Sequence, residues 1–184
     1  MMKALLINGS PRNFGSTSIL LEKIRQGLIR NGYETITYCL GDMEINYCKG
    51  CKHCYETGEC IISDDMQVIM QSLAESDAVV IGTPSYWGDV SGQMKVFFDR
   101  STPYCDTNPN MKYISKLKKG VAVAVRTGTS EKENEGILKS IYHYFGHMGI
   151  TPAESLSAVG IDSPKDFEEH HDYLQKAFDI GKSL

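Results

Sequence analysis

Four of the six cysteines lie in one short stretch with the spacing C-x2-C-x2-C-x5-C: Cys48, Cys51, Cys54 and Cys60. Thiolates three residues apart on a tight loop can turn toward one point. Four sulfurs around one point suit an iron-sulfur cluster or a tetrahedral zinc ion. A loop of empty reduced or oxidised thiols is the remaining alternative. The spacing differs from that of bacterial ferredoxins, in which the fourth cysteine follows after three residues and precedes a proline.

A second candidate site is the polar turn that follows the predicted strand 3–8. It runs from Asn8 to Ser18 and carries Arg12 among several hydroxyl groups. Backbone N–H groups at the start of the next helix would hold a phosphate dianion together with the hydroxyls and the arginine. The turn matches neither G-x-x-x-x-G-K-[ST] nor G-x-G-x-x-G, which argues against an ATP-type P-loop and a dinucleotide-binding turn. The plainer alternative is a turn of Ser, Gly and Pro that only caps the helix.

Two further turns could contact a ligand. The turn after the predicted strand 77–82 contains Tyr86 and Trp87, the only tryptophan. Two large aromatic side chains in a turn that faces solvent favour a stacking site for a flat ring. An aromatic plug at the edge of the core, or a subunit contact, is the alternative. The turn 126–130 is rich in small residues, so its backbone N–H groups could approach the same ligand.

These turns need a framework that places them together. Strand patterns at 3–8, 33–39, 77–82, 121–126 and within 150–159 alternate with helical patterns at 16–31, from 63, at 91–101, from 130 to about 148, and from 163. Five βα units in succession predict a parallel sheet with helices on both faces. Ligands of such sheets bind at the carboxyl ends of the strands, where all three turns lie.

Three helix starts have recognisable capping residues. Ser63 is expected to cap the helix that begins with Asp64 and Asp65. Ser130 with Glu133 is a capping-box pattern, and Ser163 followed by proline is expected to open the last helix.

Length, composition and charge exclude several classes of protein. The 184 residues suit one domain, and 41% hydrophobic with 23% charged residues is ordinary for a globular enzyme or binding protein. A net charge of -4 offers no footprint for nucleic acid or an anionic membrane, and the basic run 116–119 is too short to change that. No apolar run approaches the roughly 20 residues that span a bilayer, and the start is not a signal peptide. We therefore expect a cytoplasmic protein with reduced cysteines.

The three turns together resemble those of the flavodoxin-like NAD(P)H-dependent FMN reductases. The resemblance is carried by Gly9-Ser10-Pro11-Arg12 with Ser16-Thr17, by Thr83-Pro84-Ser85-Tyr86-Trp87-Gly88, and by Met94-Lys95-Val96-Phe97-Phe98-Asp99-Arg100. The cysteine array, followed by Asp64-Asp65-Met66, is similar to that of the iron-sulfur flavoprotein branch of the family.

The resemblance implies an α/β fold, a flavodoxin-like three-layer sandwich with a five-stranded parallel sheet of order 2-1-3-4-5. One domain would cover 1–184, with a cysteine-rich loop at about 41–62. FMN would be the cofactor. The implied phosphate site is Ser10, Arg12, Ser16, Thr17 and Ser18, and the implied ring site is Pro84, Ser85, Tyr86, Trp87 and Gly88 with Thr127 and Gly128. The branch further implies a [4Fe-4S] cluster on Cys48, Cys51, Cys54 and Cys60, and the family implies a homodimer or homotetramer.

The function implied by the resemblance is an oxidoreductase in which FMN accepts a hydride from NAD(P)H. With a cluster, electrons would pass singly to a protein or small acceptor. Without one, they would pass in pairs to a quinone, azo compound, nitro compound or free flavin. Such a site needs no acid-base group, so no catalytic side chain is predicted. Two alternatives are a flavodoxin-like electron carrier that does not turn over nicotinamide, and a zinc-stabilised interaction domain with an empty flavin site.

Two histidines outside these turns also have a metal-ligand spacing. His143 and His147 are four residues apart on a predicted helix, but no glutamate is adjacent and no third ligand is evident. We therefore interpret them as ordinary residues of a helix face. Cys39 is expected in the core at the end of a strand, and Cys105 in a loop, both unpaired.

Overall fold

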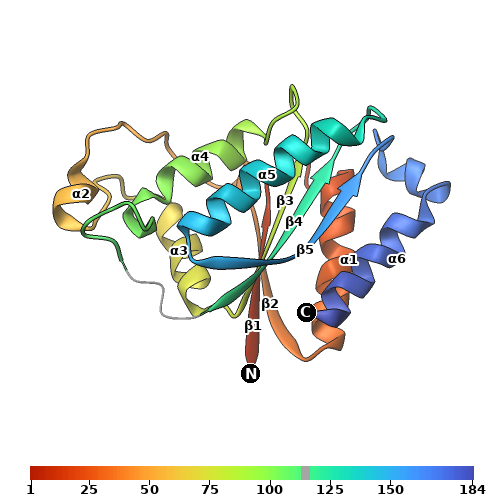
Figure 1. Ribbon diagram of the computed structural model, residues 1–184, viewed down its shortest axis with the longest axis horizontal. Coiled ribbons are helices and arrows are strands. Elements are labelled where there is room, and N and C mark those ends of the chain that lie inside the picture. Colours follow the sequence, from red (N-terminus) through yellow and green to blue (C-terminus); the bar gives the residue numbers. More distant parts are fainter. Residues whose placement is uncertain (113–116) are drawn as a thin grey trace.

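The computed structural model describes residues 1–112 and 117–184, so Lys116 of the basic run lies outside the described residues. Five parallel strands follow the order β2-β1-β3-β4-β5, as predicted (Figure 1). The strands are β1 (Met2–Asn8), β2 (Tyr33–Cys39), β3 (Ala78–Pro84), β4 (Lys118–Val125) and β5 (Ile150–Ala158). The helices are α1 (Ser16–Arg30), α2 (His53–Thr57), α3 (Met66–Glu75), α4 (Gly92–Arg100), α5 (Glu131–His147) and α6 (His171–Ser183).

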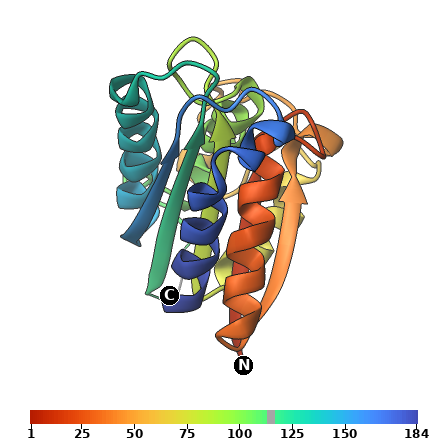
Figure 2. The ribbon, with the colours of Figure 1, turned by 90° about the vertical axis from the view of Figure 1, so that its right-hand side faces the viewer.

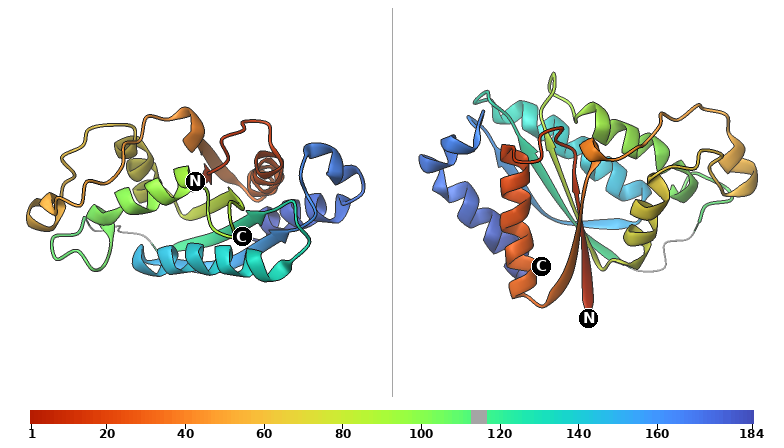
Figure 3. Two further views of the ribbon diagram at one scale, coloured as in Figure 1. Left: turned by 90° about the horizontal axis from the view of Figure 1, so that it is seen from above. Right: turned by 180° about the vertical axis from the view of Figure 1, so that it is seen from behind.

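The central strands are buried on both faces, which explains their nearly continuous apolar sequences. Leu5 and Ile7 of β1 belong to one core cluster with residues of α3, α4 and α5. Leu6 of β1 and Val80 of β3 belong to a second cluster with residues of α1 and α6. The molecule is therefore a three-layer α/β sandwich, which the two views of Figure 3 show from above and from behind.

Helices α1 and α6 lie side by side on one face of the sheet (Figure 2). Glycines make this close packing feasible. A Cβ atom added to Gly27 would lie 2.1 Å from the Phe178 carbonyl oxygen, and one added to Gly181 would lie 2.1 Å from the Ile24 carbonyl oxygen. The two backbones thus approach more closely than any residue with a side chain allows at these positions.

The chain between β2 and α3 forms a long loop that contains α2 and the cysteine array. The loop projects beyond α3 and α4, on the side of the molecule away from α1 and α6 (Figure 1). No helix among residues 1–112 and 117–184 is long and apolar enough to cross a membrane.

None of the three predicted helix caps matches its prediction in full. Helix α3 begins at Met66 after Asp65, and the Asp64 carboxylate rather than Ser63 accepts the Met66 N–H at 3.1 Å. Ser130 is the N-cap residue of α5, as expected, but its side chain makes no cap hydrogen bond, and Glu133 pairs with the Arg126 guanidinium at 2.6 Å rather than completing a capping box. Ser163 does form a capping box, but the element it opens is a short 3₁₀ helix, Pro164–Glu168, before α6.

Candidate functional site

The polar turn after β1 is organised by a buried side chain, Asn8. Its Oδ1 accepts the Ser10 N–H at 2.9 Å, and its Nδ2 donates to Ser18 Oγ at 2.9 Å. The hydroxyls of Ser10 and Ser18 both donate to the Arg12 carbonyl oxygen, at 3.2 and 3.1 Å. These bonds hold the turn in one shape before any ligand arrives. Asn8 was not among the predicted site residues, because an amide at the end of a strand has no distinctive spacing.

Ser16 lies at the first position of α1 and, unlike Ser10 and Ser18, its hydroxyl makes no hydrogen bond to the described residues. The Oγ atom is also buried. The N-cap residue of α1 is Gly15, so no side chain caps the first turn of the helix. The N–H groups at the start of a helix have no partner within the helix, and they attract anions. Thr17 is buried beside Ser16, while the Arg12 side chain is exposed above the turn.

The aromatic turn after β3 is a tight reversal with an exposed tip. Tyr86 and Asp89 exchange backbone hydrogen bonds of 3.0 and 3.1 Å. Between them, Trp87 has φ +58° and Gly88 has φ +75°. A left-handed conformation is rare for a large side chain and marks a position that the surroundings hold under strain. Tyr86 is 44% exposed and Trp87 is fully exposed, so neither ring plugs the core.

Hydrogen bonds link the first and second turns to each other and to β4. Gly9 N–H donates to the Gly82 carbonyl at 2.8 Å, and the Ser91 hydroxyl donates to the Gly9 carbonyl at 2.6 Å. Ser91 also caps α4. Ser85, next to Pro84, donates its N–H to the Val125 carbonyl at 2.7 Å. Ser91 is a second organising residue that sequence reasoning missed, because its partner lies 82 positions away.

The third turn follows β4 and is shaped by Arg126. The guanidinium donates to the Ser130 carbonyl at 3.1 Å and pairs with Glu133. A Cβ on Gly128 would lie 2.5 Å from this guanidinium, so a larger residue there would displace the Arg126 side chain. The Thr127 hydroxyl donates to Asp162 at 3.0 Å. The three turns occupy the carboxyl ends of β1, β3 and β4, which are neighbours in the sheet, so the predicted flavin residues share one edge.

The cysteine loop exposes its thiols. Cys48 and Cys51 are exposed, whereas Cys54 on α2 and Cys60 are half-buried. Burial raises the pKa of the Cys54 thiol, and the negative charges of the Cys60, Cys48 and Cys51 thiolates raise it further. A positively charged group among the four would remove the repulsion between these charges.

A buried ion pair joins the two segments where the cysteine loop begins and ends. Arg100 of α4 binds both carboxylate oxygens of Asp64, at 2.7 and 3.0 Å. The same guanidinium donates to the Asn46 carbonyl at 2.6 Å and to the Ile62 carbonyl at 3.4 Å. One side chain thus holds the segments just before Cys48 and just after Cys60. Burial alone would raise the pKa of Asp64, but the hydrogen bonds from Arg100, Asn46 and Met66 outweigh it and lower that pKa to about 2.

The segment 102–112 also supports the cysteine loop, through contacts with α2. Asn108 is buried and donates to the Cys54 carbonyl at 3.1 Å. Asn110 donates to the Tyr55 carbonyl at 2.6 Å, and its own carbonyl leaves no room for a Cβ on Gly58, at 2.6 Å. The position of the array therefore depends on the segment 102–112 as well as on α4.

The sulfurs of the cysteine array are too far apart to bind a single metal ion as they stand. Within the described part of the chain, no three of them have sulfurs that all lie within 4.8 Å of one another. Four thiolates on one zinc ion stand about 3.8 Å apart, given Zn–S bonds of about 2.3 Å. The four sulfurs would therefore have to move closer together to bind one zinc ion.

Comparison with known proteins agrees with these features. The model of the NADPH-dependent FMN reductase family matches residues 2–162. An iron-sulfur flavoprotein of Methanocaldococcus jannaschii is 35% identical over an alignment that covers 100% of this chain and 95% of the relative. One of Archaeoglobus fulgidus is 38% identical and covers 100% of this chain and 79% of the relative. A solved NAD(P)H:quinone oxidoreductase from Methanothermobacter marburgensis has a TM-score of 0.76 at 17% identity, with 98% of each chain covered, which demonstrates the shared fold.

Proposed function

The chain belongs to the NADPH-dependent FMN reductase family, and from this premise we propose that it oxidises NAD(P)H with bound FMN and carries an iron-sulfur cluster on its cysteine loop. It is an oxidoreductase of that family. When bound, FMN accepts a pair of electrons from a nicotinamide and can release them singly, which is chemistry that no side chain supplies. The chain's own residues would bind the FMN, orient it and shield it from water.

The observation that carries the proposal is the unpaired hydroxyl at the start of α1. A buried hydroxyl without a partner destabilises a protein by about 1–3 kcal/mol unless a ligand satisfies it. Ser16 is such a group, at a helix N-terminus that no side chain caps. A phosphate would accept from Ser16 Oγ and from the first N–H groups of α1. Ser10 and Ser18 shape the turn, Thr17 lines it, and the exposed Arg12 supplies a cation for the dianion.

The turns after β3 and β4 would hold the flavin ring. Trp87 and Tyr86 offer exposed aromatic surface on a rigid tip that includes Pro84, Ser85 and Gly88. Backbone N–H groups of Gly88, Thr127 and Gly128 would stabilise negative charge on a reduced ring, because preorganised donors act without reorganisation. This role requires no proton transfer by a side chain.

Cys48, Cys51, Cys54 and Cys60 would bind the cluster. The spacing of the four cysteines on one loop, the base of that loop held by Arg100, and the iron-sulfur flavoproteins among the relatives support this assignment. A [4Fe-4S] cluster exchanges single electrons, so we propose a one-electron protein or small-molecule acceptor. If the loop holds no cluster, a quinone, azo, nitro or free flavin acceptor of electron pairs is the alternative.

Domain organisation, assembly and location follow as parts of the same proposal. We propose that the chain is one FMN-binding domain with the cysteine loop as its insertion, and that it forms a homodimer or homotetramer in the cytoplasm. Phe14 and Trp87, on the turns after β1 and β3, are almost wholly exposed, and burying them in a subunit contact would remove apolar surface from water. Six unpaired cysteines suit a reducing compartment.

Anaerobically purified protein provides the test. We expect one FMN per chain, with iron and acid-labile sulfide in equal amounts. Replacing the four array cysteines with serine should remove iron and sulfide and leave FMN bound, whereas Cys39→Ser should change neither. Rapid mixing with NADPH and NADH should bleach the flavin absorption. A flavin that neither nucleotide bleaches would identify an electron carrier, and a colourless protein after FMN addition would identify an interaction domain.

A further inference from the structure

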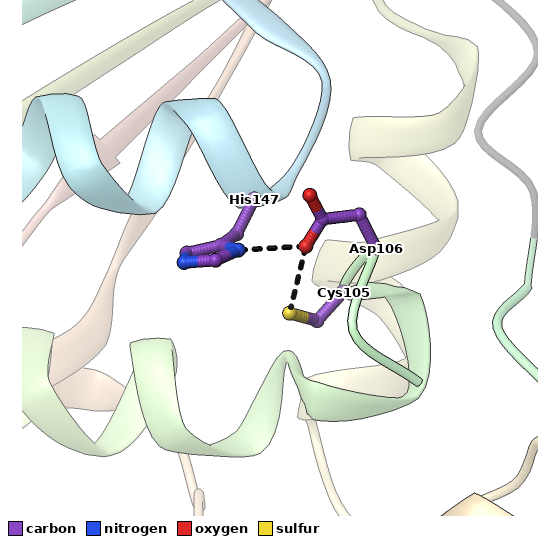
Figure 4. A group of neighbouring side chains, drawn as sticks. All are labelled: Cys105, Asp106 and His147. Atoms are coloured by element: carbon purple, nitrogen blue, oxygen red, sulfur yellow. Dashed lines mark hydrogen bonds and ion pairs between the residues drawn. The ribbon is translucent and has the colours of Figure 1, made fainter. Parts of the chain in front are cut away.

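A second group of metal-ligating side chains lies outside the cysteine array, where the start of the segment 102–112 meets the end of α5. Cys105 Sγ, a carboxylate oxygen of Asp106 and a ring nitrogen of His147 all lie within 4.8 Å of one another (Figure 4). His147 Nδ1 is 2.6 Å from Asp106 Oδ1, and Cys105 Sγ is 3.6 Å from the same oxygen. Among the residues that the structure describes, this is the only trio of His, Cys, Asp and Glu groups with such close ligand atoms.

The backbone holds the three residues in place. The Asp106 N–H donates to the His147 carbonyl at 3.0 Å, which joins the loop to the last turn of α5. A turn with the Asn108 N–H bonded to the Cys105 carbonyl at 2.9 Å keeps the loop compact, and the Cys105 sulfur lies 3.1 Å from Thr107 Oγ1. The side chains therefore converge from two elements that are already fastened together.

The Cys105–Asp106 separation and the charges of the trio suit one divalent ion. Two ligands of a tetrahedral zinc ion with Zn–S of about 2.3 Å and Zn–O of about 2.1 Å stand about 3.6 Å apart, as the Cys105 and Asp106 atoms do. One thiolate and one carboxylate neutralise a divalent cation, and a neutral imidazole adds a nitrogen ligand. His147 Nδ1 and Asp106 Oδ1 are hydrogen-bonded at 2.6 Å, closer than the about 3.4 Å between two such ligands of one zinc ion. Metal binding would therefore remove the shared proton and move the two atoms apart.

A cavity gives the ion access and a further ligand position. Between α4 and α5 lies a space of about 630 Å³ that Cys105, His143 and His147 line. The His143 ring is exposed, and its centroid is 4.6 Å from that of His147. The fourth position of the ion would therefore face the cavity, where His143 or water can fill it.

We propose that Cys105, Asp106 and His147 bind a divalent transition-metal ion of the zinc class, separate from the cysteine array and independent of the proposed flavin chemistry. The ion would fasten the start of the segment 102–112, whose Asn108 and Asn110 hold the cysteine loop. The simpler alternative is a surface ion pair in which His147 and Asp106 stabilise the end of α5. That pair assigns no role to Cys105.

The test removes the competing thiols and then titrates metal. A parent variant with Cys48, Cys51, Cys54 and Cys60 all replaced by serine, with FMN bound, is dialysed against Zn²⁺ and its metal content is measured. A separate metal-free sample receives Co²⁺ in place of Zn²⁺, and its spectrum is followed at wavelengths longer than flavin absorbs, where four-coordinate Co²⁺ absorbs strongly. We expect one ion per chain and a four-coordinate Co²⁺ spectrum.

Single substitutions in this parent then identify the ligands. Cys105→Ser and His147→Ala should each weaken Zn²⁺ binding by at least about tenfold, since even indirect supports of a metal site are worth about 10- to 100-fold. His171→Ala, at an exposed histidine of α6, is the matched control and should bind as the parent does. Circular dichroism and FMN content establish that each variant is folded. A parent that binds no Zn²⁺, or a Cys105→Ser variant that binds it unchanged, would overturn the proposal.

Discussion

Arg100 and Asp64 form a bidentate ion pair with both side chains almost wholly buried, 1% and 4% exposed. The pair joins α4, which packs on the sheet, to the residues that flank the cysteine array. Because Arg100 also binds the Asn46 and Ile62 carbonyls, the loop between them has a fixed base. An exposed array of thiols can in this way keep a defined shape at the periphery of the fold.

Asp64→Asn should therefore destabilise the protein strongly. Removing one partner of a buried ion pair leaves an uncompensated charge and costs about 3–5 kcal/mol. Urea denaturation measures the free energy of unfolding. Lys95→Ala, which breaks an exposed pair with Asp99 on the same helix, is the control and should change that free energy by less than about 1 kcal/mol. Equal effects of the two substitutions would refute a special role for the Arg100 pair.

The contribution of this pair should persist into acid. The pKa of Asp64 is about 2 in the folded protein, and an unfolded aspartate titrates at about 3.9. A depressed carboxyl pKa contributes stability that is fully present above the unfolded value and is lost as pH falls through the folded value. The difference in unfolding free energy between the native protein and Asp64→Asn should be constant at neutral pH and shrink between about pH 4 and pH 2. A difference that shrinks already near pH 6 would contradict the assignment.

Sequence patterns predicted the sheet and its strand order because they depend on local periodicity and on the regular βα succession. The contacts that shape the sites depend instead on residues far apart in the chain. Asp64 and Arg100 are 36 positions apart, and Asp106 and His147 are 41 apart. His147 also lies beside Cys105 in the structure, and no spacing rule in the sequence relates these two residues. The Ser130 capping box failed for a similar reason, since Arg126 attracts Glu133 away from the helix start.

Ser16 and Ser18 should respond in opposite ways to replacement with alanine. Ser16→Ala removes a buried hydroxyl without a partner, so the stability of the FMN-free protein should stay the same or rise by about 1 kcal/mol. Its FMN affinity should fall about tenfold or more, because a hydrogen bond to a charged group is lost. Ser18→Ala removes bonds to Asn8 and Arg12 and should lower stability by about 1–3 kcal/mol.

Thermal unfolding and FMN titration of both serine variants provide the measurements. An unchanged FMN affinity in Ser16→Ala would mean that the phosphate lies elsewhere. The FMN-free proteins must be compared first, because bound FMN would stabilise the folded state by mass action and mask the difference.

Trp87 should report flavin binding directly. It is the only tryptophan, so quenching of its fluorescence by added FMN follows flavin binding through a single emitting side chain. Trp87→Gly removes the stacking surface and should weaken FMN binding about tenfold. Because the left-handed backbone at this position suits glycine, stability should change by no more than about 1 kcal/mol. An unchanged FMN affinity with a smaller assembly on size-exclusion chromatography would instead identify Trp87 as a subunit contact.

The packing of α1 against α6 predicts opposite effects of alanine at two glycines. Alanine is favoured over glycine in helices by about 1 kcal/mol, so Gly146→Ala in α5, where a Cβ meets no atom within 4 Å, should stabilise by about 0.5 kcal/mol. At Gly27 the same methyl group would meet the Phe178 carbonyl oxygen, and α6 must shift to relieve the overlap. Overpacking of this kind costs about 3 kcal/mol. Chemical denaturation measures the free energy of unfolding of the two variants and so separates the cost of the α1–α6 overlap from the gain in helix propensity. If Gly27→Ala also stabilises the protein, α1 and α6 are farther apart than the structure has them.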